Sequence, residues 1–113
     1  MKILIPSNGD EMDSIISPVF ARSNNLLIFN IENNTITINN QQKNPIKEKE
    51  HAGKLITKYL KENNINTIIT YRIGKKAEKL LKENKINIYQ AKVGTIEENI
   101  DLYTKKQLAK ISN

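Results

Sequence analysis

A short stretch in the middle of the chain carries residues suited to bind an anion. Arg72, Lys75 and Lys76 surround Gly74, where a β-branched apolar run gives way to apolar residues spaced three and four apart. A strand that leads directly into a helix leaves the first helical amides unpaired, and these amides attract negative charge. The pattern predicts an anion site at Gly74, although ordinary strand–helix joints with solvated lysines look the same and bind nothing.

His51 is the single histidine of a chain that contains no cysteine. A neutral imidazole can coordinate iron, so His51 is the candidate metal ligand. One histidine does not make a closed metal site, and a histidine at a helix start also serves as a polar surface residue or a capping partner. The absence of cysteine excludes an iron–sulfur cluster held by thiolates of this chain.

The acidic residues Asp10, Glu11 and Asp13 invite an enzymatic interpretation, since carboxylates can hold the metals of phosphoryl transfer. That chemistry needs carboxylates fixed on central strands, and the strands predicted at 3–5 and 67–69 carry none. The serines of the first loop have no second histidine to serve as their base. We therefore expect a protein that is not an enzyme.

The composition sets the class of protein. A chain of 113 residues with 38% hydrophobic content can form one core and is too short for two. No stretch is apolar over the length of a membrane span, and the chain starts directly with a strand pattern, so we expect a cytoplasmic protein without membrane partners. The net charge of +6 favours anionic partners, while aromatic residues at 5% disfavour single-stranded nucleic acid.

The apolar patterns predict a single α/β domain built on a mixed five-stranded sheet with flanking helices. A strand that Pro6 ends is followed by a hairpin, and two more strands then alternate with three helices. The predicted strands are 2–5, 26–31, 35–38, 66–70 and 86–89. The predicted helices begin near Ala52, near Lys75 and after the cap Thr95, and the chain is expected to fray from Lys105. The predicted core includes Ile3, Ile5, Ile68, Ile69 and Ile88, with Leu55, Tyr59, Leu80, Leu81 and Ile100 from the helices.

The first, fourth and fifth predicted strands should be parallel, so the loops that follow them should meet at one edge of the sheet. The loop 6–20 brings Ser7, Asn8 and Gly9 to this edge, and the joint at Gly74 lies beside them. We count the amides of these residues as part of the predicted site. The loops 6–20 and 41–50 are polar and interrupted by proline, which predicts mobile, exposed connections.

Four segments in order resemble one known family. They are 1–9 (MKILIPSNG), 17–22 (SPVFAR), 70–77 (TYRIGKKA) and 93–98 (VGTIEE). Together they resemble the dinitrogenase iron-molybdenum cofactor biosynthesis family, which includes NifX, NafY and the carboxyl-terminal part of NifB. The resemblance implies a ribonuclease H-like fold. It also implies binding or carriage of iron–sulfur or iron–molybdenum cofactor precursors, with cluster-assembly proteins as partners.

The chain departs from the family pattern at the residues that matter for binding. Val19 stands where the family usually has a histidine, and Ala21 replaces a glycine. Tyr71 and Arg72 replace two flexible positions of a common Thr-Gly-Gly-Ile-Gly segment. Arg72 either compensates, by supplying a guanidinium with five donors, or obstructs the inherited site.

Two hypotheses of function follow, and a hydrolase is a distant third. The first is a small carrier of an anionic iron–sulfur or iron–molybdenum-type cluster, and the second is a regulatory or interaction module of the same fold that binds no cluster. The site predicted for the carrier comprises Ser7, Asn8, Gly9, Arg22, Arg72, Gly74 and Lys75, with His51 as the metal ligand.

Overall fold

The computed structural model describes residues 1–33 and 35–111, with residues 39–42 described by their backbone alone. The elements in chain order are β1 (Lys2–Ser7), β2 (Asn25–Glu32), β3 (Thr35–Lys43), α1 (Ala52–Glu62), β4 (Thr67–Thr70), α2 (Lys75–Glu83), β5 (Asn87–Gln90) and α3 (Ile96–Thr104). These elements form one α/β domain, as the sequence predicts. Among the described residues, no helix is long and apolar enough to cross a membrane.

The five strands form one mixed sheet in the order β3-β2-β1-β4-β5. β1, β4 and β5 are parallel, and β2 runs antiparallel to both β1 and β3. The hairpin turn places Asn33 at φ 50°, a left-handed conformation that asparagine tolerates better than most residues. Asn34 lies outside the described residues.

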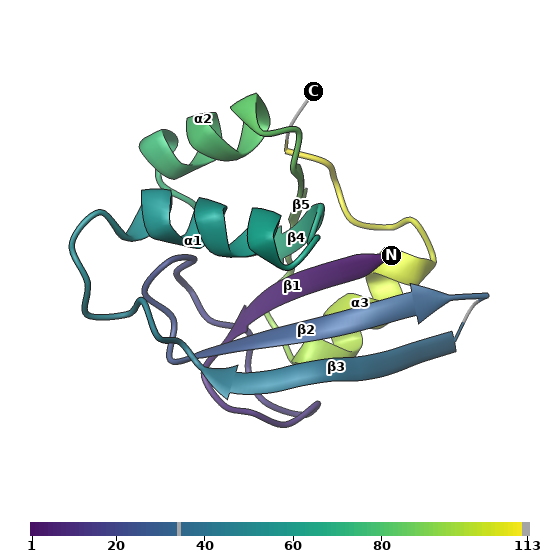
Figure 1. Ribbon diagram of the computed structural model, residues 1–113. Coiled ribbons are helices and arrows are strands. Elements are labelled where there is room, and N and C mark those ends of the chain that lie inside the picture. Colours follow the sequence, from purple (N-terminus) through teal and green to yellow (C-terminus); the bar gives the residue numbers. More distant parts are fainter. Residues whose placement is uncertain (34, 112–113) are drawn as a thin grey trace.

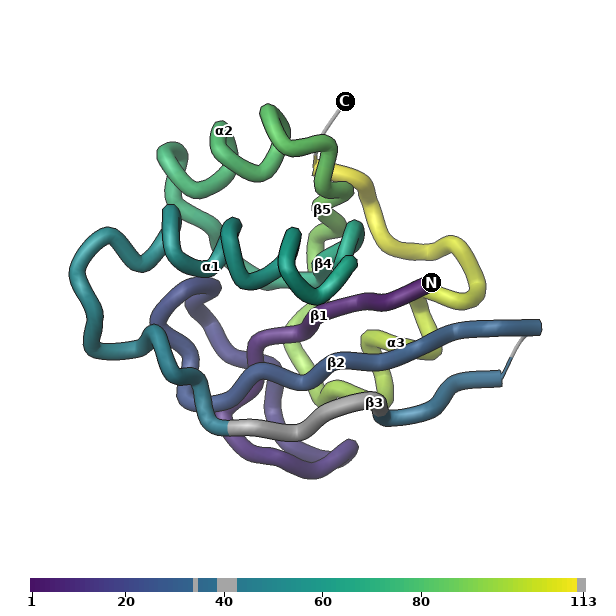
Figure 2. The backbone as a smooth tube through the Cα atoms, viewed as in Figure 1, coloured from purple at the N-terminus to yellow at the C-terminus, as the bar shows by residue number. Residues whose placement is uncertain are grey.

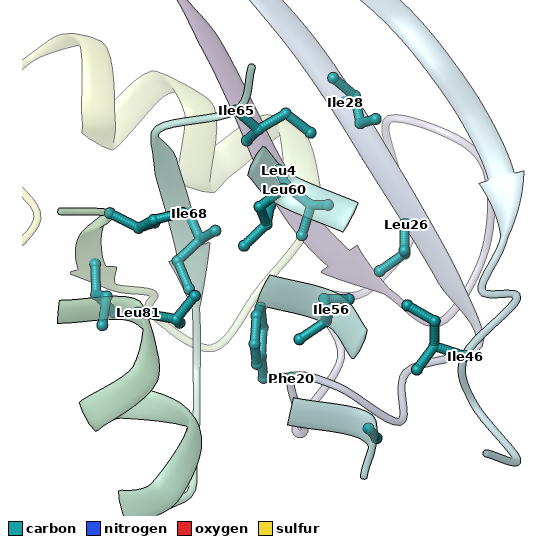
Figure 3. Packing of buried hydrophobic residues seen from close by; sticks show 13 residues of the cluster. Leu4, Phe20, Leu26, Ile28, Ile46, Ile56, Leu60, Ile65, Ile68 and Leu81 are labelled. Carbon is teal, nitrogen blue, oxygen red and sulfur yellow. The ribbon is translucent and has the colours of Figure 1, made fainter. Parts of the chain in front are cut away.

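Helices cover both faces of the sheet, with α1 and α2 on one side and α3 on the other (Figure 1). Successive residues of β1 supply both layers, because Leu4 packs toward α1 and α2 while Ile3 and Ile5 pack toward α3. Figure 3 shows how two loop residues, Phe20 and Ile46, complete the first layer beside α1. The predicted core is confirmed for Ile3, Ile5, Ile68, Ile69, Ile88, Leu81 and Ile100, whereas Leu55, Tyr59 and Leu80 are half-buried.

Pro6 does not end the first strand, and this prediction is wrong. β1 continues to Ser7, with Pro6 opposite Leu26 of β2. The carbonyl of Pro6 accepts a hydrogen bond from the amide of Ser17 at 3.0 Å, on the edge of β1 where pairing with β4 has already ended at Leu4. Because the N and C=O of a strand residue point to the same side, the missing amide of proline removes no bond to β2.

The segment after the hairpin contains more β-strand than the sequence predicts. β3 extends to Lys43, so the predicted connection begins later than residue 41. Asn44 and Ile46 are buried, so the predicted exposure is wrong for these two residues. The Asn44 side chain donates to the carbonyl oxygens of Ala21 at 2.8 Å and Ser23 at 3.0 Å. It also accepts from the Ile46 amide at 2.9 Å. Both the nitrogen and the oxygen of this buried side chain are therefore hydrogen-bonded, and they hold the two loops together.

Residues 105–111 also depart from the predicted fraying, because residues 109–111 pair with the sheet. The amide of Gln90 donates to Ala109 and that of Ile111 to Ile88, each at 2.7 Å, on the outer edge of β5. Leu108 is 7% exposed and joins the core beneath α3. Sequence periodicity cannot show this pairing, since a strand of two or three residues has no measurable period.

Candidate functional site

Two helices begin at the same end of the molecule and border one cleft. α1 starts after His51 and α2 after Gly74, and Figure 2 shows the two starts on the same side. The cleft between them and the loop 19–22 has a volume of about 780 Å³. The residues that line it are Val19, Phe20, Ala21, Arg22, His51, Ala52, Gly53, Arg72, Ile73, Gly74, Lys75, Lys76 and Ala77.

The lining of the cleft is positively charged. It includes four cationic side chains, Arg22, Arg72, Lys75 and Lys76, and none of the described residues that line it has a carboxylate. Two helix N-termini add the positive ends of their dipoles. Glu78, in the first turn of α2, forms an ion pair with Lys82 at 2.8 Å. The arrangement therefore favours an anionic occupant.

The start of α2 leaves its own amides available. Gly74 is the N-cap, in an extended conformation with φ −69° and ψ 153°, and within the described residues no side chain caps this helix. A Cβ atom on Gly74 would meet nothing within 4 Å. Neither its dihedral angles nor its surroundings require glycine here. Because glycine has no side chain that could accept from them, the amides of Lys75 and Lys76 stay accessible.

Arg72 lies on the wall of the cleft, next to Tyr71. Its guanidinium carbon is 5.9 Å from the centre of the Tyr71 ring, within the range of a cation–π contact. The hydroxyl of Thr70 donates to the Arg72 carbonyl at 3.3 Å and ties the joint to the end of β4. The guanidinium thus lies over the Tyr71 ring, and Arg72 lines the same cleft as Gly74 and Lys75.

Arg22 has a partner that sequence reasoning could not foresee. Its Nη1 atom donates to the carbonyl oxygens of Lys47 at 2.9 Å and Lys49 at 3.2 Å. These contacts hold the segment that leads into α1 against the loop 19–22. Arg22 therefore shapes the wall of the cleft, and its remaining N–H groups are the ones that could reach an occupant.

His51 lines the cleft from the start of α1. Its backbone is left-handed, with φ 56° and ψ 40°, its carbonyl accepts from the Leu55 amide at 3.0 Å, and its exposed side chain makes no cap hydrogen bond. No group of three or more histidine, cysteine, aspartate or glutamate side chains in the described part of the chain could hold a metal ion. The cleft can provide positive charge and hydrogen-bond donors to a bound cluster, and one imidazole at most as a metal ligand.

Three predicted site residues lie outside the lining of the cleft. The Ser7 hydroxyl accepts from the Gly9 amide at 3.3 Å, and the Asn8 carbonyl accepts from the Asn25 side chain at 3.1 Å. A Cβ atom on Gly9 would come within 2.5 Å of the Ser14 hydroxyl. These residues fold the loop against β2 and against itself, so the structure does not bring them to the cleft.

Gly53 contributes to the cleft and was not among the predicted site residues. A Cβ atom on Gly53 would lie 3.4 Å from Cβ of Ala77, so the first turns of α1 and α2 approach closely at this point. A glycine inside a predicted helix is the sequence signal for such an approach. Lys76, whose charge the sequence shows plainly, also lines the cleft beside Lys75.

These features define a small single-domain α/β protein with an electropositive cleft at the start of two helices. Residues 1–106 match the model of the family described as dinitrogenase iron-molybdenum cofactor, and the chain belongs to this family. An uncharacterised protein of Methanocaldococcus jannaschii is 30% identical over 97% of this chain and 91% of its own length. The family resemblance seen in the sequence is therefore confirmed.

Solved structures share the fold. A candidate dinitrogenase from Methanocaldococcus jannaschii is 31% identical, with a TM-score of 0.74 over 100% of this chain and 96% of the other. The apo form of the orange protein from Desulfovibrio gigas is 18% identical, with a TM-score of 0.85 over 99% and 93% of the two chains. A candidate NifB protein from Thermotoga is 24% identical, with a TM-score of 0.80 over 99% and 94%. The last two show the fold alone.

Proposed function

We propose that this protein binds and carries an anionic metal cluster of the iron–sulfur or iron–molybdenum-cofactor type in the cleft between α1 and α2. The observation that carries the proposal is the cleft lining, with its four cationic side chains and no carboxylate among the described lining residues. Membership of the dinitrogenase iron-molybdenum cofactor family supports a role related to that cofactor. The protein acts in the cytoplasm, without catalysis, between cluster-assembly proteins that donate and receive the cluster.

Binding by this cleft is electrostatic and reversible. Clusters with thiolate or sulfide ligands are usually anionic, and this chain has no thiolate that could hold one covalently. Arg72, Lys75 and the first amides of α2 bind the anion, Arg22 holds the cleft wall, and His51 is the candidate metal ligand. A carrier benefits from this arrangement, because cargo held without thiolate exchange can be released to the next protein.

The second candidate function is a regulatory or interaction module that binds no cluster. Among the described residues, no group of three or more histidine, cysteine, aspartate or glutamate side chains could hold a metal ion, which favours this function. The exposed Val19 at the rim of the cleft also suits a protein contact. In this case Arg72 would obstruct the inherited site, and the cleft would recognise an acidic partner surface.

Anaerobic reconstitution with iron and sulfide, followed by visible absorption and metal analysis, tests the proposal. We expect charge-transfer absorption, with metal retained at low salt and released as salt rises, since exposed charges are screened over about 8 Å at physiological ionic strength. Colourless protein without bound metal would favour the interaction module.

Arg72→Ala then separates compensation from obstruction. Weaker uptake of the cluster would mean that the guanidinium binds it, as we propose. Tighter uptake would mean that Arg72 obstructs the cleft, because removal of the side chain opens the wall beside Gly74. Arg72 is exposed, so its replacement by alanine should leave the fold intact.

A further inference from the structure

A second pocket lies at the other end of the sheet, where β1 begins and α3 ends. Met1, Ile31, Ile36 and Leu108 form its apolar wall, and Tyr89, Tyr103 and Lys106 contribute aromatic rings and a cation. Its volume of about 750 Å³ falls in the range of small-molecule sites. In Figure 1 the N-terminus, the end of α3 and the segment after it meet at this place. We call it the tyrosine pocket.

The two tyrosines give the pocket aromatic surface in two orientations. The ring centres of Tyr89 and Tyr103 are 5.1 Å apart, and the ring planes are nearly perpendicular at 87°. A flat ring placed in the pocket can stack on one tyrosine and meet the other edge to face, which are the two favourable geometries for aromatic pairs. An aliphatic ligand would be stabilised only by the burial of its apolar surface.

The polar groups of the pocket suit a negative charge. Lys106 is exposed at the rim, and none of the described residues in the lining has a carboxylate. Asp101, one turn earlier in α3, forms an ion pair with Lys105 at 2.9 Å. Burial raises the pKa of Tyr103, so its hydroxyl keeps its proton and can donate. That hydroxyl also interacts with the Thr67 side chain. It donates to the weak acceptor Sδ of Met1 at 3.7 Å, and a carboxylate oxygen would be a stronger acceptor than this sulfur.

The wall of the pocket is already formed. Lys106 has φ 59° and its amide donates to the Tyr103 carbonyl at 3.0 Å, which ends α3 and turns the chain back. Leu108 is buried at 7% exposure, and the following residues pair with β5. A ligand would therefore meet a preorganised site and would not have to order this segment.

We propose that the tyrosine pocket binds a planar aromatic carboxylate of about two fused rings. The rings lie against Tyr89 and Tyr103, and the carboxylate accepts hydrogen bonds from the Lys106 ammonium and the Tyr103 hydroxyl. This site is independent of the cleft, since the two linings share no residue.

Titration of the full chain with naphthoate, followed by two-dimensional amide NMR, tests this proposal. We expect saturable shifts at Ile36, Tyr89 and the residues 103–108. Absence of saturation at millimolar naphthoate would overturn the proposal. Shifts centred on Arg72 and Lys75 would also overturn it, because they would show an anion bound in the cleft.

Lys106→Asn provides the matched variant, because asparagine also tolerates the left-handed conformation at this exposed position. We expect naphthoate to bind about tenfold more weakly, the effect of losing one charge-assisted hydrogen bond. Neutral naphthylmethanol should bind the variant and the natural chain equally. Equal weakening of both ligands, or of neither, would show that Lys106 does not recognise a carboxylate.

Discussion

The start of α3 and the start of α2 differ in whether a side chain hydrogen-bonds to the first amides of the helix. Thr95 accepts from the Glu98 amide at 3.1 Å, and the Glu98 carboxylate accepts from the Thr95 amide at 2.9 Å, which completes a capping box. The start of α2 has Gly74 in place of a capping side chain and is bordered by cations. The chain thus satisfies its own amides at one helix start and leaves them accessible at another, in the cleft where we propose an anion binds.

The largest effect should come from β4, the strand that leads into α2. Ile68 is fully buried at the centre of β4, between β1 and β5. Ile68→Ala should lower the free energy of unfolding by roughly 2–5 kcal/mol, because it removes deep core volume. Urea denaturation measures this loss. A change within the scatter of surface substitutions would mean that β4 does not form the core of the sheet.

A smaller effect is expected at the capped helix start. Thr95→Ala should lower the free energy of unfolding by about 1 kcal/mol at neutral pH, since it removes the acceptor for the Glu98 amide. Chemical denaturation of both proteins provides the measurement. Equal stability of the two would show that the capping box does not stabilise α3.

The same box should respond to acid. Hydrogen bonds from the Thr95 amide and hydroxyl lower the pKa of Glu98 below its ordinary value of 4.5. A carboxyl with a depressed pKa stabilises the fold above its unfolded value, and this contribution disappears as the pH falls through the folded value. The difference in stability between Thr95→Ala and the natural chain should therefore shrink below about pH 4.5. A difference that grows in acid would contradict the assignment.

The uncapped helix start can be converted into a capped one. The dihedral angles of Gly74 allow serine, and the space for its Cβ atom is open. Gly74→Ser should stabilise the fold by a few tenths of a kcal/mol and weaken cluster uptake, because the hydroxyl occupies an amide of α2. Gly74→Ala is the control, with the same Cβ atom and no cap. Serine that leaves uptake at the level of alanine would show that these amides do not bind the cluster.

Amide hydrogen exchange should register the smallest, most local difference. The Glu98 amide is hydrogen-bonded to Thr95, so it should exchange more slowly than the amide of Lys76 at the corresponding turn of α2. Binding of a cluster in the cleft should slow exchange at Lys76 and leave Glu98 unchanged. Unchanged exchange at Lys76 in a saturated sample would place the cluster elsewhere.

The sequence predicts those parts of the molecule that depend on local pattern. The buried strands around Ile3 and Ile68 and the cap at Thr95 follow from apolar period and helix-start chemistry. Arg72 and Lys75 were placed together because they are neighbours in the chain at a strand–helix joint. The sequence therefore predicts that Arg72 and Lys75 lie close together, and both line the cleft.

The remaining features depend on contacts between distant residues. Arg22 donates hydrogen bonds to the carbonyl oxygens of Lys47 and Lys49, and no sequence pattern in either segment predicts these bonds. Ser7 is the last residue of β1, and Asn8 and Gly9 follow it. The hydrogen bond from Asn25 to Asn8 and the close approach of Ser14 to Gly9 turn this loop away from the cleft. A loop after a parallel strand reaches the correct edge of the sheet, and its own side-chain contacts decide where it goes from there.

Cluster uptake by a charge-deleted cleft tests the central claim most directly. The variant Arg72→Ala, Lys75→Ala, Lys76→Ala removes three cations from the cleft, and Lys58→Ala, Lys61→Ala, Lys79→Ala removes three exposed cations that are not among its lining residues. The two variants have the same net charge, so general attraction of anions is matched. After anaerobic reconstitution, we predict that metal analysis finds the cluster in the control and little of it in the cleft variant. Equal metal content in the two folded variants would contradict binding in this cleft.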